Sequence, residues 1–594
     1  MKMPNLQKIR RILSRKEQLN ILIIIFLYIL FTISEVISIS VIIPIIGLFI
    51  KPSMITSSET LRTLYLWSRV ADPLSFLMLL VIVAIFIFTA KSIYGIIILY
   101  VQQKYISTLN IRLSTHILHE YMLRPYEFHL LNNSSVLFKN VNVEVSQFTS
   151  GYLSNIILIV TEAIVLLGLL SFVIYLYPIV ATITILCIGL VVIGLNAILN
   201  RKMARCASDR SFYSELYYRK AMESLQSVKE IKVFGVYDFF LKQYSKAFGI
   251  YMRSVIKSNI IAIIPRYFLE TLLFFCILLV ILISAYNKAN LHEIVSMMAI
   301  FVIVSIRLMP SVYKINQSVT LAHYSSNSLE IVYDIIVETE TTNKKTLIPI
   351  TTINDDESHI RFDNISFSYS AGQQNIVNNC NVTIIPNAIT AFVGKTGTGK
   401  STIIDIAMGL LLPQQGSLYY GNMEITEATV DIYRTKIGYV PQTIILIDDT
   451  IAANIAFGLP QTCWEESKLN LAVEIAQLKT FIEELSEGLM TVVGERGVRI
   501  SGGQRQRIGI ARAFYRDPEI MVFDEATSAI DVSTEERIYK AVKKLNKTVI
   551  LVTHRPVTLN FADVIYVLDN GSISKQERYV DREPLLKHDY VLGA

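Results

Sequence analysis

The strongest chemical signal in the sequence is a glycine-rich loop at residues 394–401, which read Gly-Lys-Thr-Gly-Thr-Gly-Lys-Ser and match the pattern G-x-x-x-x-G-K-S. An apolar run, ITAFV, precedes this loop, and a helix-like run, STIIDIAMGLL, follows it. Glycines allow backbone N–H groups to wrap phosphate oxygens, and the start of the following helix adds positive potential. The pattern predicts a nucleotide site in which Lys400 reaches the outer phosphates and the Ser401 hydroxyl ligates Mg²⁺.

A second element is an apolar run at residues 520–523 that ends in two carboxylates, Asp524 and Glu525. Beside a phosphate loop, one such carboxylate holds Mg²⁺ through water and another polarises the attacking water. An apolar strand can also end in two carboxylates without any catalytic role, but here the pair follows Lys400 within one alternation of strand-like and helix-like runs. We expect Asp524 to serve the metal and Glu525 to act on water.

Residues 501–504, Ser-Gly-Gly-Gln, precede Asp524 and resemble the signature motif of ATP-binding-cassette proteins. Ile500 stands before them where the family usually has Leu, a departure that leaves the serine hydroxyl and the glycine amides in place. A Ser-Gly-Gly turn at a helix start is itself a second anion-binding arrangement. The resemblance implies ATP and Mg²⁺ as cofactors, with two cassettes paired head to tail so that each signature closes over ATP on the other.

Further positions resemble the same family one by one. Tyr369 matches the aromatic residue that stacks on adenine, Gln442 the glutamine that senses Mg²⁺, and His554 the switch histidine at the γ-phosphate, although Pro556 follows where Leu is commoner. Residues 528–531 match the loop that couples the two sites, and residues 493–497 match an exporter-specific loop. The resemblance implies catalytic roles for Glu525, His554 and Gln442, and metal contacts from Ser401, Gln442 and Asp524. The residues that it implies as ATP contacts are Tyr369, Gly394, Lys395, Thr396, Gly397, Thr398, Gly399, Lys400, Ser401, Thr402, Ser501, Gly502, Gly503, Gln504 and Asp531.

Composition divides the chain into a membrane part and a water-facing part. The 594 residues are 52% hydrophobic and 18% charged, with a net charge of +6; this excludes an ordinary soluble enzyme and gives no argument for nucleic-acid binding. Five scattered cysteines form neither a paired framework nor a metal motif. Stretches apolar enough to cross a bilayer lie in the first 320 residues, and we expect six spans at 21–50, 74–101, 152–176, 179–199, 259–286 and 294–320.

The connections between these spans predict the orientation. Residues 1–20 and the long connection at 200–258 are rich in Lys and Arg, whereas the opposite side carries few, so the positive-inside rule places both termini in the cytoplasm. The long connections at 102–151 and 200–258 are helix-patterned, and we expect them to extend the spans into water as hairpins. Residues 56–70, on the outer side, begin with a capping-box pattern and form either a short helix or an ordinary loop.

Beyond the spans we expect a polar linker and then an α/β domain. Strand-like and helix-like runs alternate there, which predicts a parallel sheet with ligand chemistry at the C-terminal ends of its strands. The expected organisation is an all-α transmembrane domain at 1–334, a linker at 335–357 and a cytosolic α/β P-loop ATPase domain at 358–594. Six spans and one cassette resemble a half-exporter. That resemblance implies a homodimer that couples ATP hydrolysis to translocation in the bacterial inner membrane, with coupling helices at 126–140 and 222–237.

Charged residues inside the spans are costly in a bilayer and are therefore functional candidates. The basic ones outnumber the acidic Glu35, Glu162 and Glu270, so we expect them to line a substrate cavity for a polyanionic head. Arg266 and Glu270 are also spaced to neutralise each other on one helix. The four residues expected in the cavity are Lys91, Arg266, Arg307 and Lys314.

The surroundings of these charges resemble one type of flippase. Residues 264–270 and 307–311, together with the external segment 56–70, resemble the PglK-type flippases of lipid-linked oligosaccharides. The resemblance implies a pyrophosphate-linked polyprenyl oligosaccharide that moves from the cytoplasmic to the outer leaflet, in contact with membrane lipid and without a nucleic-acid partner. A lipid A-core flippase, a multidrug or peptide exporter and, in another class, an ATP-gated channel remain alternatives. Substrate-stimulated ATP hydrolysis separates the exporters, and ion currents uncoupled from turnover identify a channel.

Overall fold

The structure is a computed structural model that describes residues 4–50, 59–70, 72–176, 178–286, 291–342, 358–369, 375–494, 497, 500–553 and 555–578. Its contacts divide the chain into two compact units. The first, which we call the helical unit, comprises Met1–Arg124 and Asn132–Asn343; the second, the α/β unit, comprises Pro125–Leu131 and Lys344–Ala594.

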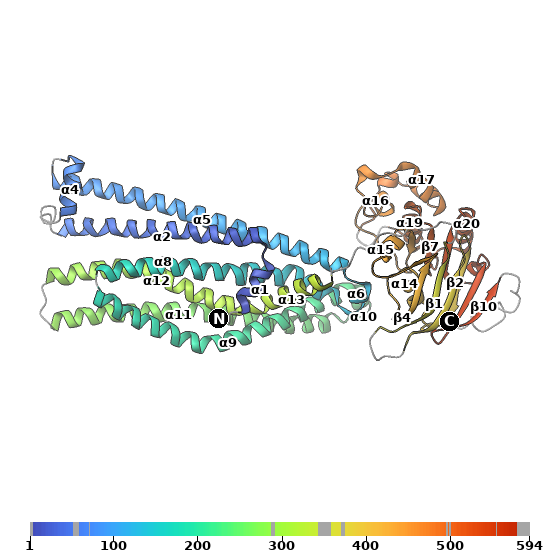
Figure 1. Cartoon of the computed structure of the whole chain (residues 1–594), viewed down its shortest axis with the longest axis horizontal. Helices are drawn as coiled ribbons and strands as arrows, with labels where there is room; N and C mark the ends of the chain where they lie inside the picture. The colour runs from blue at the N-terminus through green and yellow to red at the C-terminus, as the bar shows by residue number, and fades with distance from the viewer. Residues whose placement is uncertain are drawn as a thin grey trace. The chain divides into compact units, whose positions relative to one another are not determined.

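The helical unit is a bundle of long helices (Figure 1). At about 1.5 Å per residue, the 51 residues of Pro73–Leu123 span roughly 77 Å, far more than a bilayer core, so this helix continues into water as expected from the long connections. The helices are α1 Pro4–Ile12, α2 Arg15–Ile50, α4 Glu59–Ser68, α5 Pro73–Leu123, α7 Ser134–Lys139, α8 Ser154–Leu176, α9 Pro178–Gln226, α10 Val228–Phe234, α11 Tyr237–Tyr286, α12 Leu291–Tyr324 and α13 Ser326–Thr342, with π-helical turns η1 Asn140–Glu144 and η2 Gln147–Leu153.

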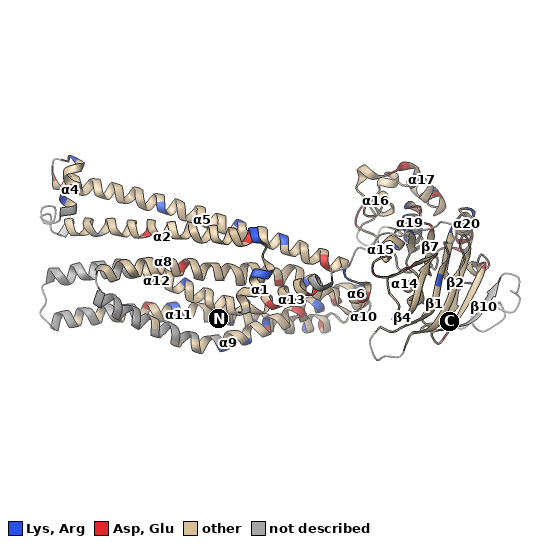
Figure 2. Cartoon of the chain, viewed as in Figure 1, with Lys and Arg blue, Asp and Glu red and all other residues tan. Residues whose placement is uncertain are grey.

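Four of the expected membrane spans are long and apolar enough within the described residues: Arg15–Phe49, Pro73–Leu123, Ser134–Phe172 and Tyr237–Leu272. The other two expected spans, 179–199 and 294–320, lie on α9 and α12, where many side chains fall outside the described residues. Along α2, α5 and α8 charged residues are sparse, and they gather toward the end of the bundle that carries α1 and α13 (Figure 2). This distribution fits helices that are half in lipid and half in water.

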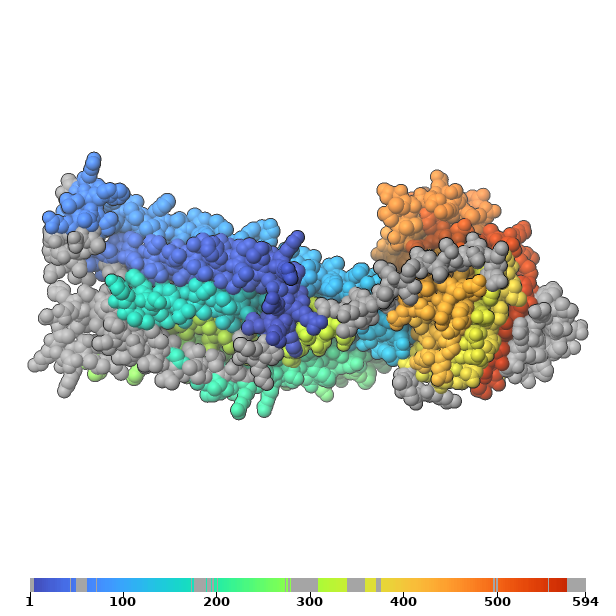
Figure 3. Space-filling model, in the orientation of Figure 1, coloured from blue at the N-terminus to red at the C-terminus, as the bar shows by residue number. Residues whose placement is uncertain are grey.

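The helices of the bundle pack in a defined order: α2 lies against α5 and α8, α8 against α12, and α11 against α9 and α12. The surface of the bundle shows α2 lying along both α5 and α8 (Figure 3). Gly168 sets the approach of α8 to α2, because a Cβ atom there would lie 2.5 Å from the Thr32 methyl group. A small residue at this point lets two apolar helices come close.

The segment expected on the outer side contains a helix from Glu59 to Ser68, where the sequence left a choice between helix and loop. Its inner side packs on the ends of α2 and α5: Leu61, Leu48 and Phe76 form one buried cluster, and the Tyr65 ring meets Phe76 edge to face. Residues 51–58, which hold the start of the expected capping box, lie outside the described residues. The π-helical turns at 140–153 were not predicted.

The expected linker begins later than predicted. The helix α13 continues to Thr342, so residues 335–342, which were expected in the linker, belong to this helix. The buried residues Val332 and Ile336 continue an apolar stripe that holds this helix although its end is polar. The two stretches expected as coupling helices contain α6 Tyr126–Leu131 and α10, and the contacts group α6 with the α/β unit.

The α/β unit contains two sheets (Figure 1). One has the order β10-β9-β3-β8-β7-β6, is parallel from β9 to β6, and confirms the predicted parallel core. The other, β2-β1-β4-β5, is antiparallel, and this second sheet was not predicted. The strands are β1 Ile360–Phe367, β2 Val377–Ile384, β3 Ile389–Gly394, β4 Gln415–Tyr420, β5 Met423–Glu424, β6 Ile437–Val440, β7 Ile520–Asp524, β8 Thr548–Val552, β9 Val564–Asp569 and β10 Ser572–Arg578.

Helices cover both faces of the parallel sheet, which is why its strands are continuously apolar. The helix α14, Lys400–Ala407, packs on one face, where Ile403 joins Phe392 and Val522 in one core cluster. The helix α19, Gly502–Tyr515, packs on the other, where Ile508 joins Phe523 in a second cluster. The remaining helices of the unit are α15 Val430–Arg434, α16 Ile451–Ile455, α17 Glu466–Ile475, α18 Lys479–Glu483, α20 Val532–Lys544 and α21 Pro556–Leu559.

Candidate nucleotide-binding and catalytic site

The phosphate loop joins β3 to α14, in the strand–loop–helix setting that the sequence predicts. Gly397 and Gly399 have φ angles of +85° and +98°, a region that residues with a Cβ atom rarely enter. A Cβ atom on Gly399 would also lie 3.0 Å from the Ile376 carbonyl oxygen. Glycine is therefore required for the loop to turn its amides toward the start of α14.

Lys400 is the first residue of α14, and its side chain folds back over the loop. The Nζ atom donates to the carbonyl oxygens of Gly394 at 2.6 Å and Lys395 at 2.8 Å. Burial lowers the pKa of Lys400, while the charges of Glu525 and Asp524 raise it. The amine thus lies between the loop and the acidic end of β7, where a phosphate chain would also lie.

The acidic end of β7 brings together the residues expected to act on water. The strand ends at Asp524, and Glu525 follows with a φ angle of +47°. Gln442, which follows β6, donates from Nε2 to the Glu525 carboxylate at 2.7 Å, so two residues 83 positions apart in the sequence are in contact. Burial raises the pKa of Asp524, and the charge of Glu525 raises it further, whereas Lys400 lowers it.

These residues suit a magnesium ion. The Ser401 hydroxyl, the Asp524 carboxylate and the Gln442 amide are the hard oxygen donors that Mg²⁺ prefers. The part of the chain that the structure describes holds no group of three His, Cys, Asp or Glu side chains able to bind a metal. An ion held by one carboxylate and a few neutral oxygens needs the phosphate oxygens of a nucleotide to complete its shell.

Tyr369 stands at the end of β1, with its ring edge to face against Phe367 at 5.2 Å between centroids. Its hydroxyl lies 3.2 Å from the Thr402 hydroxyl in α14. The side chain is half-buried. The predicted adenine-stacking residue is therefore tied to the helix that follows the phosphate loop.

The signature motif begins α19 as predicted. Ser501 caps the helix: its hydroxyl accepts from the Gln504 amide at 3.2 Å, and the Gln504 side chain accepts from the Ser501 amide at 2.8 Å. A Cβ atom on Gly503 would lie 2.9 Å from the Ala529 carbonyl oxygen, so the glycine permits close contact with the loop at 528–531. Asp531 caps α20, and hydrogen bonds from Ser533 and Thr534 lower the pKa of Asp531 to about 2.

Some predicted site residues lie outside the described residues, and one residue near the site was not predicted from the sequence. His554 and Glu495 belong to the first group. Asp405 was not predicted: burial in α14 and the charge of Asp524 together raise its pKa to about 6. Its position four residues after Ser401, on the same helix, is the signal that could have found it.

The cations expected in the substrate cavity form ion pairs where the structure describes their side chains. Lys91 in α5 is only 6% exposed and lies 2.7 Å from Glu35 of α2, so the two side chains form a buried ion pair in this structure. Lys314 of α12 lies 2.6 Å from Glu162 of α8. The sequence suggested a surplus of positive charge in the spans. Among the described residues, Lys91 and Lys314 are instead each paired with a carboxylate on a neighbouring helix.

Of the other two cations expected in the cavity, the structure describes the side chain of Arg266 but not that of Arg307. Arg266 pairs with Glu270 at 2.7 Å, as their spacing on one helix suggested, and lies over the Tyr313 ring at 5.7 Å from its centroid. The Arg307 side chain lies outside the described residues. Arg266 and Lys314 are 53% and 49% exposed, so they are the accessible cations of this group within the described side chains.

Two family models match the chain. The ABC transporter transmembrane region matches residues 20–321, and the ABC transporter model matches residues 377–528. Because the first of these alone covers half of the 594 residues, the chain belongs to the ABC transporters, a family of ATP-driven transporters. This membership confirms the resemblance inferred from the signature and phosphate-loop motifs.

Named relatives span several transporter types. The heterocyst differentiation ATP-binding protein HepA of Nostoc is 30% identical over 400 residues, covering 67% of this chain and 64% of that protein. The ATP-dependent lipid A-core flippase of Wigglesworthia glossinidia brevipalpis is 27% identical over 470 residues, covering 76% and 77%. The mitochondrial iron–sulfur clusters transporter ATM1 of Kluyveromyces lactis is 41% identical over 221 residues, covering 36% and 30%. The alignments thus span less than two thirds of HepA and ATM1.

A solved structure shares the complete architecture. A bacterial Atm1-family ABC exporter with ATP bound matches with a TM-score of 0.77, covering 96% of each chain at 20% sequence identity. At this identity the likeness establishes the fold alone. It confirms the predicted combination of a helical membrane domain and a following α/β nucleotide-binding domain.

Proposed function

We propose that the chain is an ATP-driven exporter that hydrolyses Mg²⁺-ATP and flips an anionic lipid-linked oligosaccharide to the outer leaflet. The observation that carries the ATPase part is that one chain holds the phosphate loop, the Gln442–Glu525 contact at the end of β7 and an intact signature cap on α19. Every element of a hydrolytic site is therefore encoded without a second gene product.

The geometry of the sheet supports a homodimer. The helix α14 packs on one face of the parallel sheet and α19 on the other, as their separate core clusters show. A nucleotide on the phosphate loop of one chain therefore calls for the signature of a second chain. Two identical chains would form two composite sites, and neither would need a different partner to supply a missing residue.

The residues of the site divide the work of hydrolysis. The loop amides and Lys400 bind the phosphates, and the amine exchanges its contacts with the Gly394 and Lys395 carbonyls for phosphate oxygens. Glu525, held by Gln442, orients the attacking water and accepts its proton. Mg²⁺, held by Ser401, Asp524 and Gln442, would neutralise charge on the outer phosphates.

The cargo proposal rests on accessible cations in the spans. Arg266 and Lys314 are half-exposed, and Arg266 lies over the ring of Tyr313, the residue beside Lys314. Their carboxylate partners, Glu270 and Glu162, hold them in place. A diphosphate head could replace those carboxylates during passage, whereas a neutral lipid could not.

A reconstituted flipping assay tests this function. Wild type and Glu525→Gln are placed in proteoliposomes with a fluorescent pyrophosphate-linked polyprenyl oligosaccharide, and its appearance in the other leaflet is followed with Mg²⁺-ATP. We expect flipping and substrate-stimulated hydrolysis by wild type alone.

Lipid A-core is the second candidate cargo, because lipid A-core flippases are among the similar proteins. If lipid A-core stimulates hydrolysis and is flipped while the oligosaccharide lipid is not, the cargo proposal is wrong and the ATPase proposal stands. If wild type does not hydrolyse Mg²⁺-ATP, both are wrong.

A further inference from the structure

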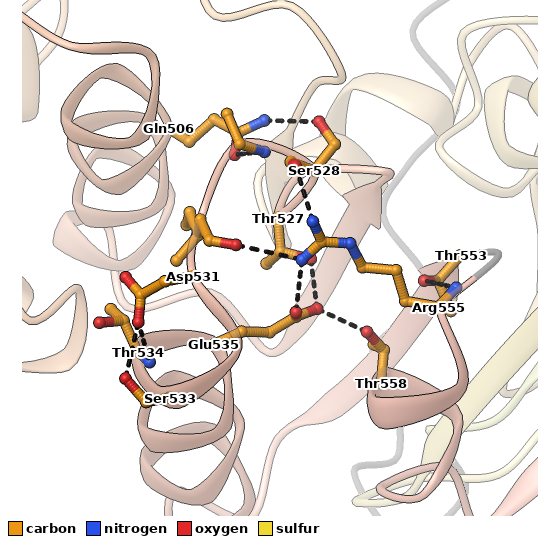
Figure 4. A network of polar contacts seen from close by, with 12 residues as sticks. Gln506, Thr527, Ser528, Asp531, Ser533, Thr534, Glu535, Thr553, Arg555 and Thr558 are labelled. Atoms are coloured by element: carbon orange, nitrogen blue, oxygen red, sulfur yellow. Dashed lines mark hydrogen bonds and ion pairs between the residues drawn. The ribbon is translucent and has the colours of Figure 1, made fainter.

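A buried carboxylate on α20 lies at the centre of a polar network that the family motifs do not include (Figure 4). The Glu535 side chain is fully buried. One of its oxygens accepts from the Thr527 hydroxyl at 2.7 Å and from the Thr558 hydroxyl at 2.5 Å, and the other accepts from Arg555 at 2.7 Å. Its partners come from two loops and the short helix α21, so this carboxylate joins separate segments of the site.

Arg555 is the second member of this network, and its guanidinium reaches the loop at 528–531 (Figure 4). Besides its bond to Glu535, it donates to the Ser528 carbonyl oxygen at 2.7 Å and to the Ile530 carbonyl oxygen at 3.1 Å. A planar, forked cation can hold several oxygens in one fixed arrangement, which a lysine cannot. Arg555 thus fixes the path of this loop backbone.

Gln506 continues the network into the signature helix α19. Its amide donates to the Ser528 hydroxyl at 2.9 Å and accepts from the Ala529 amide at 2.8 Å (Figure 4). The same loop residues therefore contact the signature helix on one side and Arg555 on the other. A displacement of this loop would therefore change the contacts of both Gln506 and Arg555.

We propose that the Glu535–Arg555 pair is a positioning linkage for ATP hydrolysis: it ties the start of α21 to the loop at 528–531 and, through Gln506, to the signature helix. Arg555 directly follows His554, the expected switch histidine, in the sequence, which is why we expect the pair to affect turnover. The inference rests on the proposed ATPase function. It predicts that breaking the pair impairs turnover more than nucleotide binding.

Adjacent residues on α20 offer a matched comparison. Glu535→Gln removes the buried charge, whereas Glu536→Gln makes the same change one residue away, in an exposed pair with Lys540 at 3.3 Å. Full-length protein in nanodiscs would be assayed for kcat and KM with Mg²⁺-ATP, for binding of a fluorescent ATP analogue, and for melting temperature. Arg555→Met and Arg555→Lys complete the set.

The linkage predicts a specific pattern across these variants. Glu535→Gln and Arg555→Met should each lower kcat at least tenfold, with KM and analogue affinity within about threefold of wild type. Arg555→Lys, which keeps the charge but loses the fork, should fall between Arg555→Met and wild type. The double variant Glu535→Gln/Arg555→Met should be no worse than Arg555→Met alone, because both changes break one linkage. Glu536→Gln should match wild type.

Other results overturn the linkage in distinct ways. A kcat of Glu535→Gln within twofold of wild type, or a lowered melting temperature without any loss of turnover, would reduce the pair to a structural contact. If Glu535→Gln does not fold, Arg555→Lys, with its part-exposed side chain, carries the same test on kcat. If wild type itself fails to hydrolyse ATP, the proposed function fails first, which separates the two outcomes.

Discussion

The buried carboxylates of the helical unit differ from the two carboxylates at the end of β7. In the helical unit, Glu35 lies 2.7 Å from Lys91, and the fully buried Glu144 lies 3.6 Å from Lys139 and 3.4 Å from Arg210. In the α/β unit, Asp524 and Glu525 stand side by side, and the nearby cation, Lys400, is bound to loop carbonyls.

Charge balance therefore distinguishes Glu35 and Glu144, which have cationic partners, from the two adjacent carboxylates at the end of β7. Buried ions that pair with each other keep a fold in one arrangement, and removing one partner leaves an uncompensated charge. Neighbouring carboxylates raise each other's pKa and attract an incoming cation. We therefore expect Glu35 and Glu144 to serve folding, and Asp524 and Glu525 to act with a magnesium nucleotide.

The largest effect is expected at Glu525, the carboxylate proposed to act on the attacking water. Glu525→Gln keeps the side-chain shape and the contact with Gln442 but loses the charge that orients and deprotonates water. We expect kcat for ATP hydrolysis to fall at least about 100-fold, an amount typical of losing a general base. Phosphate release and equilibrium binding of an ATP analogue measure the two steps separately. Turnover within tenfold of wild type would reject the role assigned to Glu525.

A large effect on the stability of the fold is expected at the buried pair of Glu35 and Lys91. Lys91→Met leaves Glu35 charged and buried between α2 and α5, and should destabilise the helical unit by about 3 kcal/mol. The double variant Glu35→Gln/Lys91→Met removes both charges and should recover most of that loss. Melting temperature in detergent compares the three proteins. If both variants melt alike and flip no substrate while folded, the pair serves transport instead.

A smaller, pH-dependent effect is expected at Asp405. Burial and the charge of Asp524 raise its pKa to about 6 in the folded protein, above the ordinary value of 3.8. The folded state therefore holds this proton more tightly than the unfolded state, and the stability that this supplies disappears as the pH rises from about 4 through 6. Asp405→Asn stays neutral and should melt higher than wild type at pH 7.5 but not at pH 4. Calorimetry of nucleotide-free protein tests this; a constant difference between these pH values would contradict it.

The smallest effect is expected at the adenine end of the site. Tyr369→Phe keeps the ring but loses the hydroxyl contact with Thr402, so ATP affinity should change by less than about twofold. Tyr369→Ala removes the stacking surface, which is worth about 1–3 kcal/mol per base, and should weaken binding about tenfold. Titration with a fluorescent nucleotide compares them. Equal affinities of the Ala and Phe variants would show that the ring does not stack on adenine.

The nucleotide site of the α/β unit was predictable because each of its motifs lies within a few consecutive residues. Gly394–Ser401, Asp524–Glu525 and Ser501–Gln504 each encode a turn, a strand end or a helix cap within a few residues, and the structure has all three in place. The alternation of strands and helices likewise predicted the parallel sheet.

The ion pairs between helices of the helical unit were not predictable because the paired residues are distant in sequence. Lys314 and Glu162 are 152 residues apart, and only the packing of α12 on α8 brings them together. Composition therefore suggested unneutralised cations where the structure has pairs. The same limit hid the network of Glu535, since nothing in a single sequence shows that Thr527, Arg555 and Thr558 face one carboxylate.

The Mg²⁺ dependence of ATP hydrolysis tests the central claim most directly. Phosphate release by the purified full-length chain is measured over a range of free Mg²⁺ for wild type and Asp524→Asn. If the acidic end of β7 awaits a magnesium nucleotide, wild type hydrolyses ATP only with Mg²⁺, and Asp524→Asn needs at least tenfold more Mg²⁺ or loses turnover. Hydrolysis in the presence of a chelator, or an unchanged Mg²⁺ dependence of Asp524→Asn, would contradict the claim.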